Sequence, residues 1–307
     1  MPIRIAIVGY GKIAVDQHVP AIQGNSEYQL VAAVSPRPPQ VPPPVPVYES
    51  VGAMLQAMPG GVDAIAVCTP PSARHPIVAE ALAAGLHVLI EKPPAATLGE
   101  VEDMVRRAHA ANRTLYAAWH AQHNDGVDDA RDRLAGKTVT RFRIEWFEDV
   151  RKWHPGQDWI FAPGGFGVFD PGINALSIST SILPMPLFIR QAKLLVPANR
   201  QQPIAVSLDF GDNLSADFDF RERPDEHWVI EVDTADGEQL RLSEGGTRLA
   251  VNGAEVKVSG IGEYPSIYQH FAKLVAANQV EVDVDPLRIV ADAFMAGSHQ
   301  TTDAFDF

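Results

Sequence analysis

A glycine-rich stretch near the start of the chain has the residue types and spacing that bind phosphate groups. It reads Gly9-Tyr10-Gly11-Lys12-Ile13-Ala14 and directly follows the apolar run of residues 3–8. In a G-x-G-x-x-A turn, the first glycine permits the tight turn, the second lets the backbone approach a pyrophosphate, and the N-terminus of the next helix faces the anion. The alternative is a turn that only joins a strand to a helix. We predict that a dinucleotide contacts this turn at Gly9, Gly11, Lys12 and Ile13.

The end of the second apolar run indicates which dinucleotide to expect. A carboxylate at this position usually accepts hydrogen bonds from the ribose hydroxyls of NAD, but here the sequence reads Ala33-Val34-Ser35-Pro36-Arg37 and has no acid. Ser35 can donate to a 2′-phosphate, and Arg37 can bind it through charge-assisted hydrogen bonds. We predict that NADP is preferred and that NAD is a second cofactor. The alternative for Arg37 is a solvated loop residue.

A lysine follows a later apolar run. Residues 86–90 are predicted to form a buried strand, and Glu91-Lys92-Pro93 comes directly after them. Ligands of open parallel sheets bind beyond the carboxyl ends of the strands, so Lys92 should reach the cofactor crevice. Thr69 and Pro70, which follow the run of residues 63–68, and Glu91 complete the predicted cofactor contacts.

These residues depend on an alternation of strands and helices in the first part of the chain. Apolar runs at residues 3–8, 30–35, 63–68, 86–90 and 115–118 alternate with helix patterns, which predicts an α/β fold with a doubly wound parallel sheet. Seven prolines between Pro36 and Pro46 exclude a helix there. One helix is expected to begin with Ser72 as its N-cap, and another with the capping box of Thr97 and Glu100. We assign residues 1–120 to an NAD(P)-binding Rossmann domain.

The pattern changes after about residue 120. Residues 138–150 alternate strongly, and further strand patterns follow near residues 187–196, 204–210, 214–221, 228–234, 239–242 and 247–251. Short polar turns join successive strands, which indicates a mainly antiparallel sheet. Helices are expected near residues 173–182, 266–277 and 286–297. We assign residues 121–307 to an α+β domain with a large, mostly antiparallel, open-faced sheet.

Composition excludes several classes of protein. The chain has 307 residues, of which 46% are hydrophobic and 21% charged, as in a globular protein with ample core. Its net charge of −13 repels a phosphate backbone, so we expect no nucleic-acid partner. Cys68 is the single cysteine, which excludes an intrachain disulfide and is interpreted as a packed thiol. No segment has the pattern of a signal peptide or a membrane span, so we expect a cytoplasmic protein without a membrane partner.

Together, the motifs resemble those of the Gfo/Idh/MocA oxidoreductase family. The resemblance covers nearly the whole chain and is carried by the G-x-G-x-x-A turn, Glu91-Lys92-Pro93 and Asp170-Pro171-Gly172-Ile173-Asn174, in that order. Within the family, residues 13–18, 91–94 and 153–157 look most like those of bacterial L-arabinose and D-galactose 1-dehydrogenases. The resemblance implies an NAD(P)-dependent dehydrogenase acting on a CH–OH group, with the substrate held by the C-terminal domain.

The resemblance also implies a reaction, the oxidation of C1 of a pyranose sugar to the lactone. The family motif usually reads D-x-G-x-H, and Asn174 stands here at the position of the histidine; an asparagine can hydrogen-bond a hydroxyl but cannot take a proton. We expect Asp170 to accept the proton of the anomeric hydroxyl and Lys92 to donate to the same oxygen, with the reverse assignment left open. The alternative for Asp170 is an N-cap, and for Asn174 a position on the helix surface.

A sugar pocket needs apolar faces for C–H groups and polar groups for hydroxyls. We expect the faces to come from Trp119, Trp153 and Trp228, each of which is alternatively a core residue, and the polar groups from His120 and Glu148. Trp146 and Trp159 are assigned to the core. His120 and His123 have no third ligand beside them, so no metal site is expected.

Other functions stay open. A non-catalytic NADP-sensing regulator can have the same fold, and other members of the family oxidise different hydroxyls, as the inositol and dihydrodiol dehydrogenases do. The sequence does not distinguish L-arabinose from D-galactose, which differ by a hydroxymethyl group. A homodimer formed through the open sheet of the C-terminal domain is the expected assembly.

Overall fold

The computed structural model describes residues 1–39, 43–221 and 226–306, so residues 40–42 of the predicted proline-rich loop lie outside the described residues. The chain forms two compact units, residues 1–120 with residues 262–284, and residues 121–261 with residues 285–307. Residues 262–284, which the sequence assigned to the second domain, therefore belong to the first unit.

Among the described residues, the first unit is built on a sheet of seven strands in the order β15-β6-β5-β4-β1-β2-β3. All its pairings are parallel. Helices pack against the strands of this sheet and the strands are buried, which explains the continuous apolar runs in the sequence. The strands are β1 (Ile3–Val8), β2 (Tyr28–Val34), β3 (Val47–Tyr48), β4 (Ala64–Val67), β5 (His87–Glu91), β6 (Leu115–Ala118) and β15 (Val280–Glu281).

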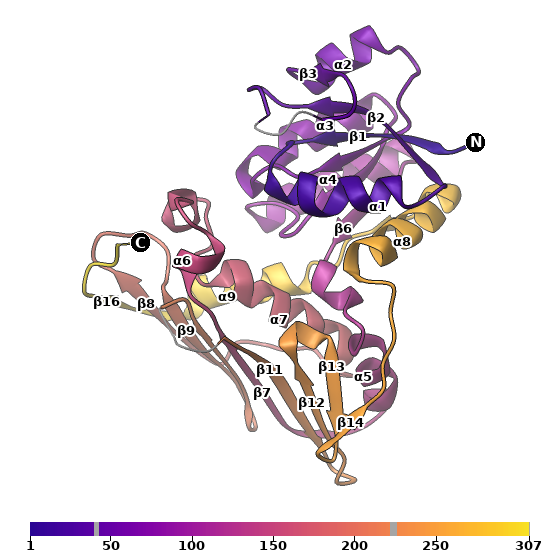
Figure 1. Cartoon of the computed structure of the whole chain (residues 1–307). Helices are drawn as coiled ribbons and strands as arrows, with labels where there is room; N and C mark the ends of the chain where they lie inside the picture. The colour runs from indigo at the N-terminus through magenta and orange to yellow at the C-terminus, as the bar shows by residue number, and fades with distance from the viewer. Residues whose placement is uncertain (40–42, 222–225, 307) are drawn as a thin grey trace. The chain divides into compact units, whose positions relative to one another are not determined.

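The helices of the first unit come from both ends of the chain. They are α1 (Val19–Gln23), α2 (Val51–Ala57), α3 (Arg74–Ala83), α4 (Leu98–Ala111) and α8 (Glu263–Ala277). Figure 1 shows α8 in gold beside the indigo α1, and the two helices are in contact. Ile5 and Ile7 of β1 join Tyr268 and Phe271 of α8 in one buried cluster. An aromatic stripe on α8 thus completes the apolar cover of the sheet.

The two predicted helix caps have different outcomes. Thr97 accepts a hydrogen bond from the Glu100 amide, and the Glu100 carboxylate accepts one from the Thr97 amide, so the capping box is confirmed. The cap at Ser72 is wrong, because a short 3₁₀ turn (Pro71–Ala73) comes first and α3 begins at Arg74 without a side-chain cap. A proline with its fixed φ can open a helical turn, and Pro71 does so here.

The strand order locates the crevice of the first unit. Strands β2 and β3 lie on one side of β1, and β4, β5 and β6 lie on the other, so the connections change direction between β1 and β4. Ligands of such sheets bind at this point, beyond the carboxyl ends. Gly9 follows β1, Thr69 comes shortly after β4, and Lys92 follows β5. The sheet therefore places the predicted cofactor residues along one edge.

The second unit has a sheet of nine strands within the described part of the chain, in the order β14-β13-β12-β11-β7-β10-β9-β8-β16. Only the pairs β7–β10 and β8–β16 are parallel among its described pairings. The strands are β7 (Val139–Phe147), β8 (Gln191–Pro197), β9 (Ala205–Gly211), β10 (Leu214–Asp219), β11 (His227–Thr234), β12 (Gln239–Ser243), β13 (Arg248–Val251), β14 (Ala254–Val256) and β16 (Ser298–Thr302). The helices are α5 (Val127–Leu134), α6 (Val150–Trp153), α7 (Phe169–Ile182) and α9 (Asp285–Ala296).

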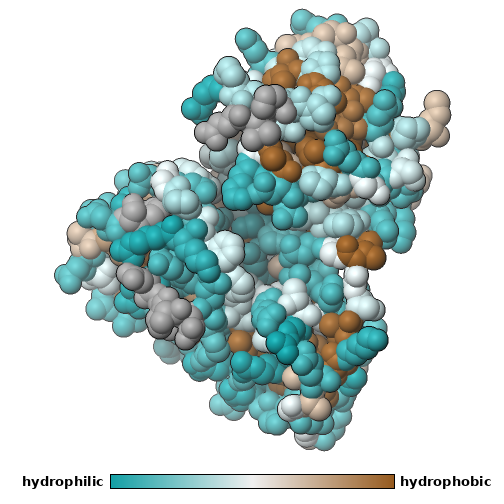
Figure 2. Space-filling view, in the orientation of Figure 1, coloured by the Kyte–Doolittle hydropathy of each residue, from teal (hydrophilic) through white to brown (hydrophobic). Residues whose placement is uncertain are grey.

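One face of this sheet packs against helices and the other is charged. Along β7, Phe142 and Ile144 are fully buried, whereas Arg143 and Glu145 are partly exposed. Arg143 pairs with Glu145 at 2.7 Å and with Asp217 of β10 at 3.4 Å. On the face that Figure 2 shows, the surface of this unit is mainly hydrophilic, with a few apolar patches. The homodimer expected through the open sheet stays a prediction, and an interface there would join ion pairs rather than apolar side chains.

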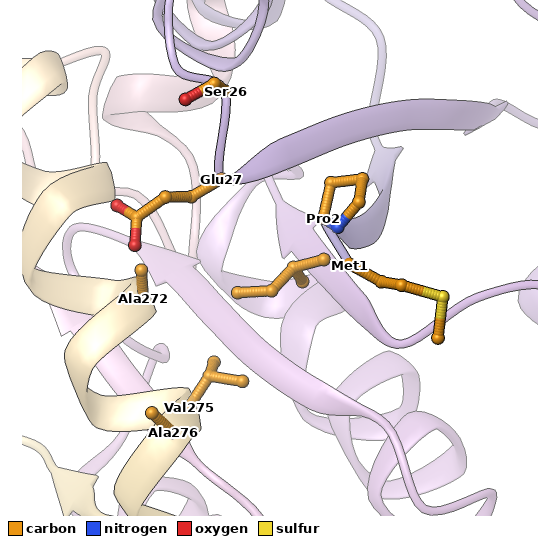
Figure 3. Close-up of a pocket in the computed structure, with 8 residues that line it drawn as sticks. Met1, Pro2, Ser26, Glu27, Ala272, Val275 and Ala276 are labelled. Carbon is orange, nitrogen blue, oxygen red and sulfur yellow. The ribbon is translucent and has the colours of Figure 1, made fainter.

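A hollow of about 510 Å³ lies in the first unit, away from the crevice. It adjoins the amino ends of β1 and β2 and one side of α8, whereas Gly9 lies at the carboxyl end of β1. Figure 3 shows Glu27 extending toward α8 across it. Its lining residues are Met1, Pro2, Ile3, Ser26, Glu27, Ala272, Val275 and Ala276.

None of the helices formed by the described residues has the length and apolar character needed to span a membrane.

Helix α7 approaches β10 closely because Gly172 has no side chain. A Cβ at Gly172 would lie 2.8 Å from Cδ1 of Phe218, a fully buried ring on β10. Such a distance requires the ring or the helix to move. The glycine of the Asp170-Pro171-Gly172-Ile173-Asn174 segment therefore sets how deeply α7 packs on the sheet.

We predict that Gly172→Ala destabilises the protein by about 1–3 kcal/mol, the usual cost of overpacking a core. The matched control is Gly99→Ala in the first turns of α4, where an added Cβ meets no heavy atom within 4 Å. Thermal unfolding measured by calorimetry should show a lower Tm for Gly172→Ala and an unchanged or higher Tm for Gly99→Ala. Equal Tm values for the two variants would contradict this packing argument.

Candidate active site

The two glycines of the phosphate-binding turn differ in what requires them. Gly9 has φ of +91°, and a Cβ on it would lie 2.8 Å from both Cγ2 and N of Thr69. Gly9 is therefore required by the fold of the protein itself. A Cβ on Gly11 would meet no atom within 4 Å, and its φ is not in the left-handed region. Open space above Gly11, at the start of a helical segment, fits the close approach of a pyrophosphate.

The other residues of this edge also fit a dinucleotide. Thr69 Oγ1 is buried and has no hydrogen-bond partner among the described residues. A buried hydroxyl without a partner costs about 1–3 kcal/mol, which a bound ligand would offset. Pro70 follows Thr69, and Lys12 and Ile13 are exposed at the turn, where the Lys12 ammonium contacts the Asp16 carboxylate. Each of these residues therefore lies at the crevice. Their contacts with a dinucleotide stay predictions.

The end of β2 carries Ser35, as predicted. Its amide donates to the Tyr48 carbonyl at 2.9 Å, and its hydroxyl donates to the Arg37 carbonyl at 2.6 Å. Arg37 is exposed, and the described residues include no acidic partner for its guanidinium. Ser35 and the exposed Arg37 thus lie two residues apart at a strand end that lacks a carboxylate.

Lys92 follows a buried, ionised glutamate. Glu91 Oε1 lies 2.9 Å from Nε2 of His18 and accepts a hydrogen bond from the Tyr264 hydroxyl at 2.6 Å. Glu91 Oε2 accepts one from the Lys92 amide at 3.0 Å. Burial by itself raises the pKa of Glu91, but the hydrogen bond and charge of His18, the charge of His120 and the Tyr264 hydroxyl outweigh it and lower this pKa to about 2. The Lys92–Pro93 peptide bond is cis.

The remaining predicted residues of the first unit follow β6. His120 Nδ1 lies 3.1 Å from Oε1 of Glu263, and its ring stacks on Tyr264 with centroids 6.0 Å apart. His120 thus lies in the same group of side chains as Glu91. Trp119 is buried, and its indole N–H donates to the Asp283 carbonyl at 3.0 Å. This arrangement favours the alternative core role for Trp119, and its contact with sugar stays a prediction.

In the second unit, α7 places Asp170 and Asn174 one turn apart on one face of the helix. The helix begins at Phe169, before Asp170, so the interpretation of Asp170 as an N-cap is wrong. Asp170 lies instead in the first turn, where the helix dipole favours its negative charge. Asn174 Oδ1 is buried and has no hydrogen-bond partner in the described part of the chain. That atom is suited to accept a hydrogen bond from a ligand hydroxyl.

A histidine that the sequence analysis did not select lies beside Asp170. His154 Nε2 is 3.5 Å from Oδ2 of Asp170, and the His154 ring packs edge-on against Phe220 at 5.7 Å. His154 follows the short helix α6 and has no periodic pattern around it. Its only signal was its place in the Trp153-His154-Pro155-Gly156-Gln157 stretch, which was used for the resemblance alone.

The aromatic residues of the second unit form a row beside Glu148. The Trp228 ring lies 6.0 Å from that of Trp146 and 5.7 Å from that of Trp153. Glu148 is buried, and its Oε2 accepts a hydrogen bond from the Trp228 indole at 3.0 Å. Trp153 is 44% exposed and can offer a ring face to a ligand. Trp146 is buried as predicted, but the core assignment of Trp159 is wrong: it is 38% exposed because its short 3₁₀ turn lies at the surface.

Each unit therefore gathers its own predicted residues. Lys92 and His120 lie in the first unit, and Asp170, Asn174 and Glu148 lie in the second. That Lys92 and Asp170 act on one substrate stays a prediction. Among the described residues, no group of three or more His, Cys, Asp or Glu side chains is arranged to hold a metal ion.

Comparison with known proteins gives consistent results for sequence and structure. The Gfo/Idh/MocA oxidoreductase family, with an NAD-binding Rossmann fold, matches residues 3–118. The chain is 48% identical to galactose 1-dehydrogenase of Pseudomonas fluorescens, over 99% of both chains. The crystal structure of D-galactose-1-dehydrogenase from Rhizobium etli matches with a TM-score of 0.92 at 45% identity, over 99% of this chain and 98% of that one. These matches confirm the predicted fold class.

A more distant structure has the same fold. KijD10, a 3-ketoreductase from Actinomadura kijaniata whose structure was solved in complex with NADP, matches with a TM-score of 0.79 at 18% identity. The match covers 98% of this chain and 100% of that chain. At this identity, the likeness concerns the fold alone.

The different roles of Gly9 and Gly11 lead to a test of the phosphate-binding turn. We predict that Gly11→Ala leaves the Tm of the ligand-free protein within about 1 °C, because the added methyl group enters open space, but weakens dinucleotide binding at least about tenfold. Gly9→Ala should lower the Tm itself, because of its positive φ and the contact with Thr69. Calorimetry and NADP⁺ titration measure both effects. Unchanged NADP⁺ affinity in Gly11→Ala would contradict the assignment of this turn.

Proposed function

Because the chain belongs to the Gfo/Idh/MocA oxidoreductase family, we propose that it oxidises C1 of D-galactose or L-arabinose to the lactone and transfers the hydride to NADP⁺. The observation that carries this proposal is the 48% identity with galactose 1-dehydrogenase over 99% of both chains. The chain is thus an oxidoreductase that acts on a CH–OH group of a sugar. The choice between the two sugars and the preference for NADP⁺ are the proposed details.

The proposed reaction breaks two bonds, C1–H at the anomeric carbon and O–H of its hydroxyl group. The hydrogen on C1 leaves with the bonding electron pair as hydride, which a bound NADP⁺ would accept, and the proton of the O1 hydroxyl passes to the Asp170 carboxylate. The C1–O1 bond becomes the carbonyl of the lactone. A positioned base typically contributes about 10²–10⁴-fold to the rate. The Lys92 ammonium donates to O1 and stabilises its developing negative charge.

Further side chains of the second unit support this role of Asp170. His154, with Nε2 at 3.5 Å from Asp170 Oδ2, can pair with the carboxylate and keep it oriented toward O1. Asn174 Oδ1 can accept a hydrogen bond from a ring hydroxyl. Trp153 offers an apolar face to the sugar, and Trp228 holds Glu148 in place through its indole N–H. The reverse assignment, with Lys92 as the base, predicts the same product.

The catalytic assignment is tested by Lys92→Ala and Asp170→Asn, assayed as NADPH production from a panel of pentoses and hexoses. We predict that wild-type protein oxidises D-galactose and L-arabinose, and that each variant lowers kcat at least about 100-fold while NADP⁺ affinity changes little. Asp128→Asn, the same chemical change at an exposed helix position, is the control and should keep full activity.

Three outcomes would overturn parts of this assignment. Near-normal turnover in either variant removes that residue from the mechanism. Binding of NADP⁺ without oxidation of any sugar favours the non-catalytic regulator, and oxidation of inositol or a dihydrodiol instead of aldoses favours the other family activities. We expect kcat/KM for D-galactose and for L-arabinose to differ by no more than about 10–200-fold, because this is the discrimination that one small group in a pocket provides.

The preference for NADP⁺ is proposed from the strand end that lacks an acid. We predict that Ser35→Asp lowers the ratio of NADP⁺ to NAD⁺ efficiency at least about tenfold, because a carboxylate repels the 2′-phosphate and accepts from a ribose hydroxyl. Arg37→Ala should weaken NADP⁺ binding and leave NAD⁺ binding unchanged. Steady-state kinetics with each dinucleotide measures both ratios, and an unchanged ratio in both variants would refute the assignment of Ser35 and Arg37.

A further inference from the structure

The backbone on both sides of Lys92 is held by buried ionic side chains. Arg74, at the start of α3, is 4% exposed, and its Nη1 donates to the carbonyls of Glu91 and Pro93. Its Nε donates to the Thr69 carbonyl at 2.8 Å. The Glu91 carboxylate accepts from the Lys92 amide at 3.0 Å. Hydrogen bonds thus hold the peptide group before Lys92 and the one after Pro93, and the same guanidinium ties them to the strand end that carries Thr69.

The Glu91 carboxylate is itself held from two directions. His18, which is fully buried before α1, places Nε2 at 2.9 Å from Glu91 Oε1. Tyr264 of α8 donates to the same oxygen at 2.6 Å. On its other side, His18 Nδ1 lies 2.8 Å from the Tyr268 hydroxyl. The side chains that face this pair and can carry charge or a proton are Cys68, His120, Tyr264 and Tyr268.

The stability of the fold is a weak reason to bury these charged side chains around Lys92. A buried ion pair pays a large desolvation cost, and apolar side chains of similar volume often stabilise a fold equally well. What charged groups supply is a defined geometry, because each donor fixes the direction of one acceptor. In this unit, that geometry is concentrated on the peptide groups around one lysine.

We propose that His18, Arg74, Glu91 and Tyr264 are positioning residues that hold Lys92 at the reacting oxygen. This inference rests on the proposed sugar oxidation, in which Lys92 donates to O1. Loss of one of these contacts lets the Lys92 backbone shift. A shift of about 1 Å at a reacting group can cost on the order of 10²-fold in rate. The dinucleotide still binds, because residues 9–13, which are predicted to contact its pyrophosphate, include none of these four side chains.

Two pairs of variants test the proposal, each with a matched control in the same unit. Tyr264→Phe removes the donor to Glu91. Tyr28→Phe removes a buried donor to the Tyr268 carbonyl, at 2.7 Å, without removing a hydrogen bond made by His18, Glu91 or Lys92. Arg74→Lys removes the planar group that bridges the carbonyls around Lys92. Arg113→Lys removes a bridge between the Gly85 and Asn112 carbonyls.

The readouts are the Tm, the stoichiometry and Kd of NADP⁺ binding, and the KM and kcat for D-galactose, with kcat expressed per NADP⁺-binding site. We expect Tyr264→Phe and Arg74→Lys to lower kcat at least about tenfold while NADP⁺ still binds one per chain with its Kd within about threefold. Tyr28→Phe should lower the Tm about as much as Tyr264→Phe does, and both Tyr28→Phe and Arg113→Lys should keep kcat within about twofold. A folding defect alone would reduce the number of binding sites and leave kcat per site unchanged.

The inference is overturned if each variant and its control have the same kcat per site, or if Tyr264→Phe loses binding sites in proportion to activity. Should Arg74→Lys fail to fold, the tyrosine pair decides the question by itself. Failure of the proposed function is a different result: wild-type protein would oxidise no sugar, or Lys92→Ala would retain its activity. Either finding would remove the inference too, because positioning requires a reaction in which Lys92 takes part.

Discussion

An ionised carboxylate inside a protein needs donors around it, and the first unit supplies them for Glu91 from distant parts of the chain. Burial opposes its charge, and His18 and Tyr264 compensate through hydrogen bonds at 2.9 and 2.6 Å. His18 comes from the segment after the phosphate-binding turn, and Tyr264 comes from α8. Residues 262–284 therefore return to the first unit both to cover an apolar sheet and to complete a polar group at the carboxyl end of β5.

The second unit positions its proposed catalytic and sugar-binding groups by a different means. Helix α7 carries Asp170 and Asn174 on one face, and its depth on β10 depends on the absence of a side chain at Gly172. His154 reaches Asp170 from the loop after α6, and Trp228 holds Glu148 at the end of β7. One unit thus holds its lysine through backbone hydrogen bonds at a strand end, and the other holds its carboxylate through helix packing.

The sequence was most informative where local pattern determines structure. Continuous apolar runs identified five of the seven strands described in the parallel sheet, and the glycine spacing located the turn after β1, because both reflect short-range requirements of the backbone. The two-residue strands β3 and β15 are too short to form such a run. It placed α8 in the second domain rather than in the first unit, since an apolar stripe shows that a helix is covered but not by which sheet. It also missed His154, whose partner Asp170 is near in space but follows no periodicity. His18 was missed because a histidine within a helical pattern gives no sign of its buried partners.

The central claim is that Lys92 of one unit and Asp170 of the other act on a single carbon–oxygen bond. A double-mutant cycle tests it most directly, with kcat for D-galactose measured in Lys92→Ala, Asp170→Asn and the double variant. Groups that act together on one atom have strongly non-additive effects. The account predicts a double variant within about tenfold of the slower single variant. Losses that multiply, as for independent sites, would contradict it.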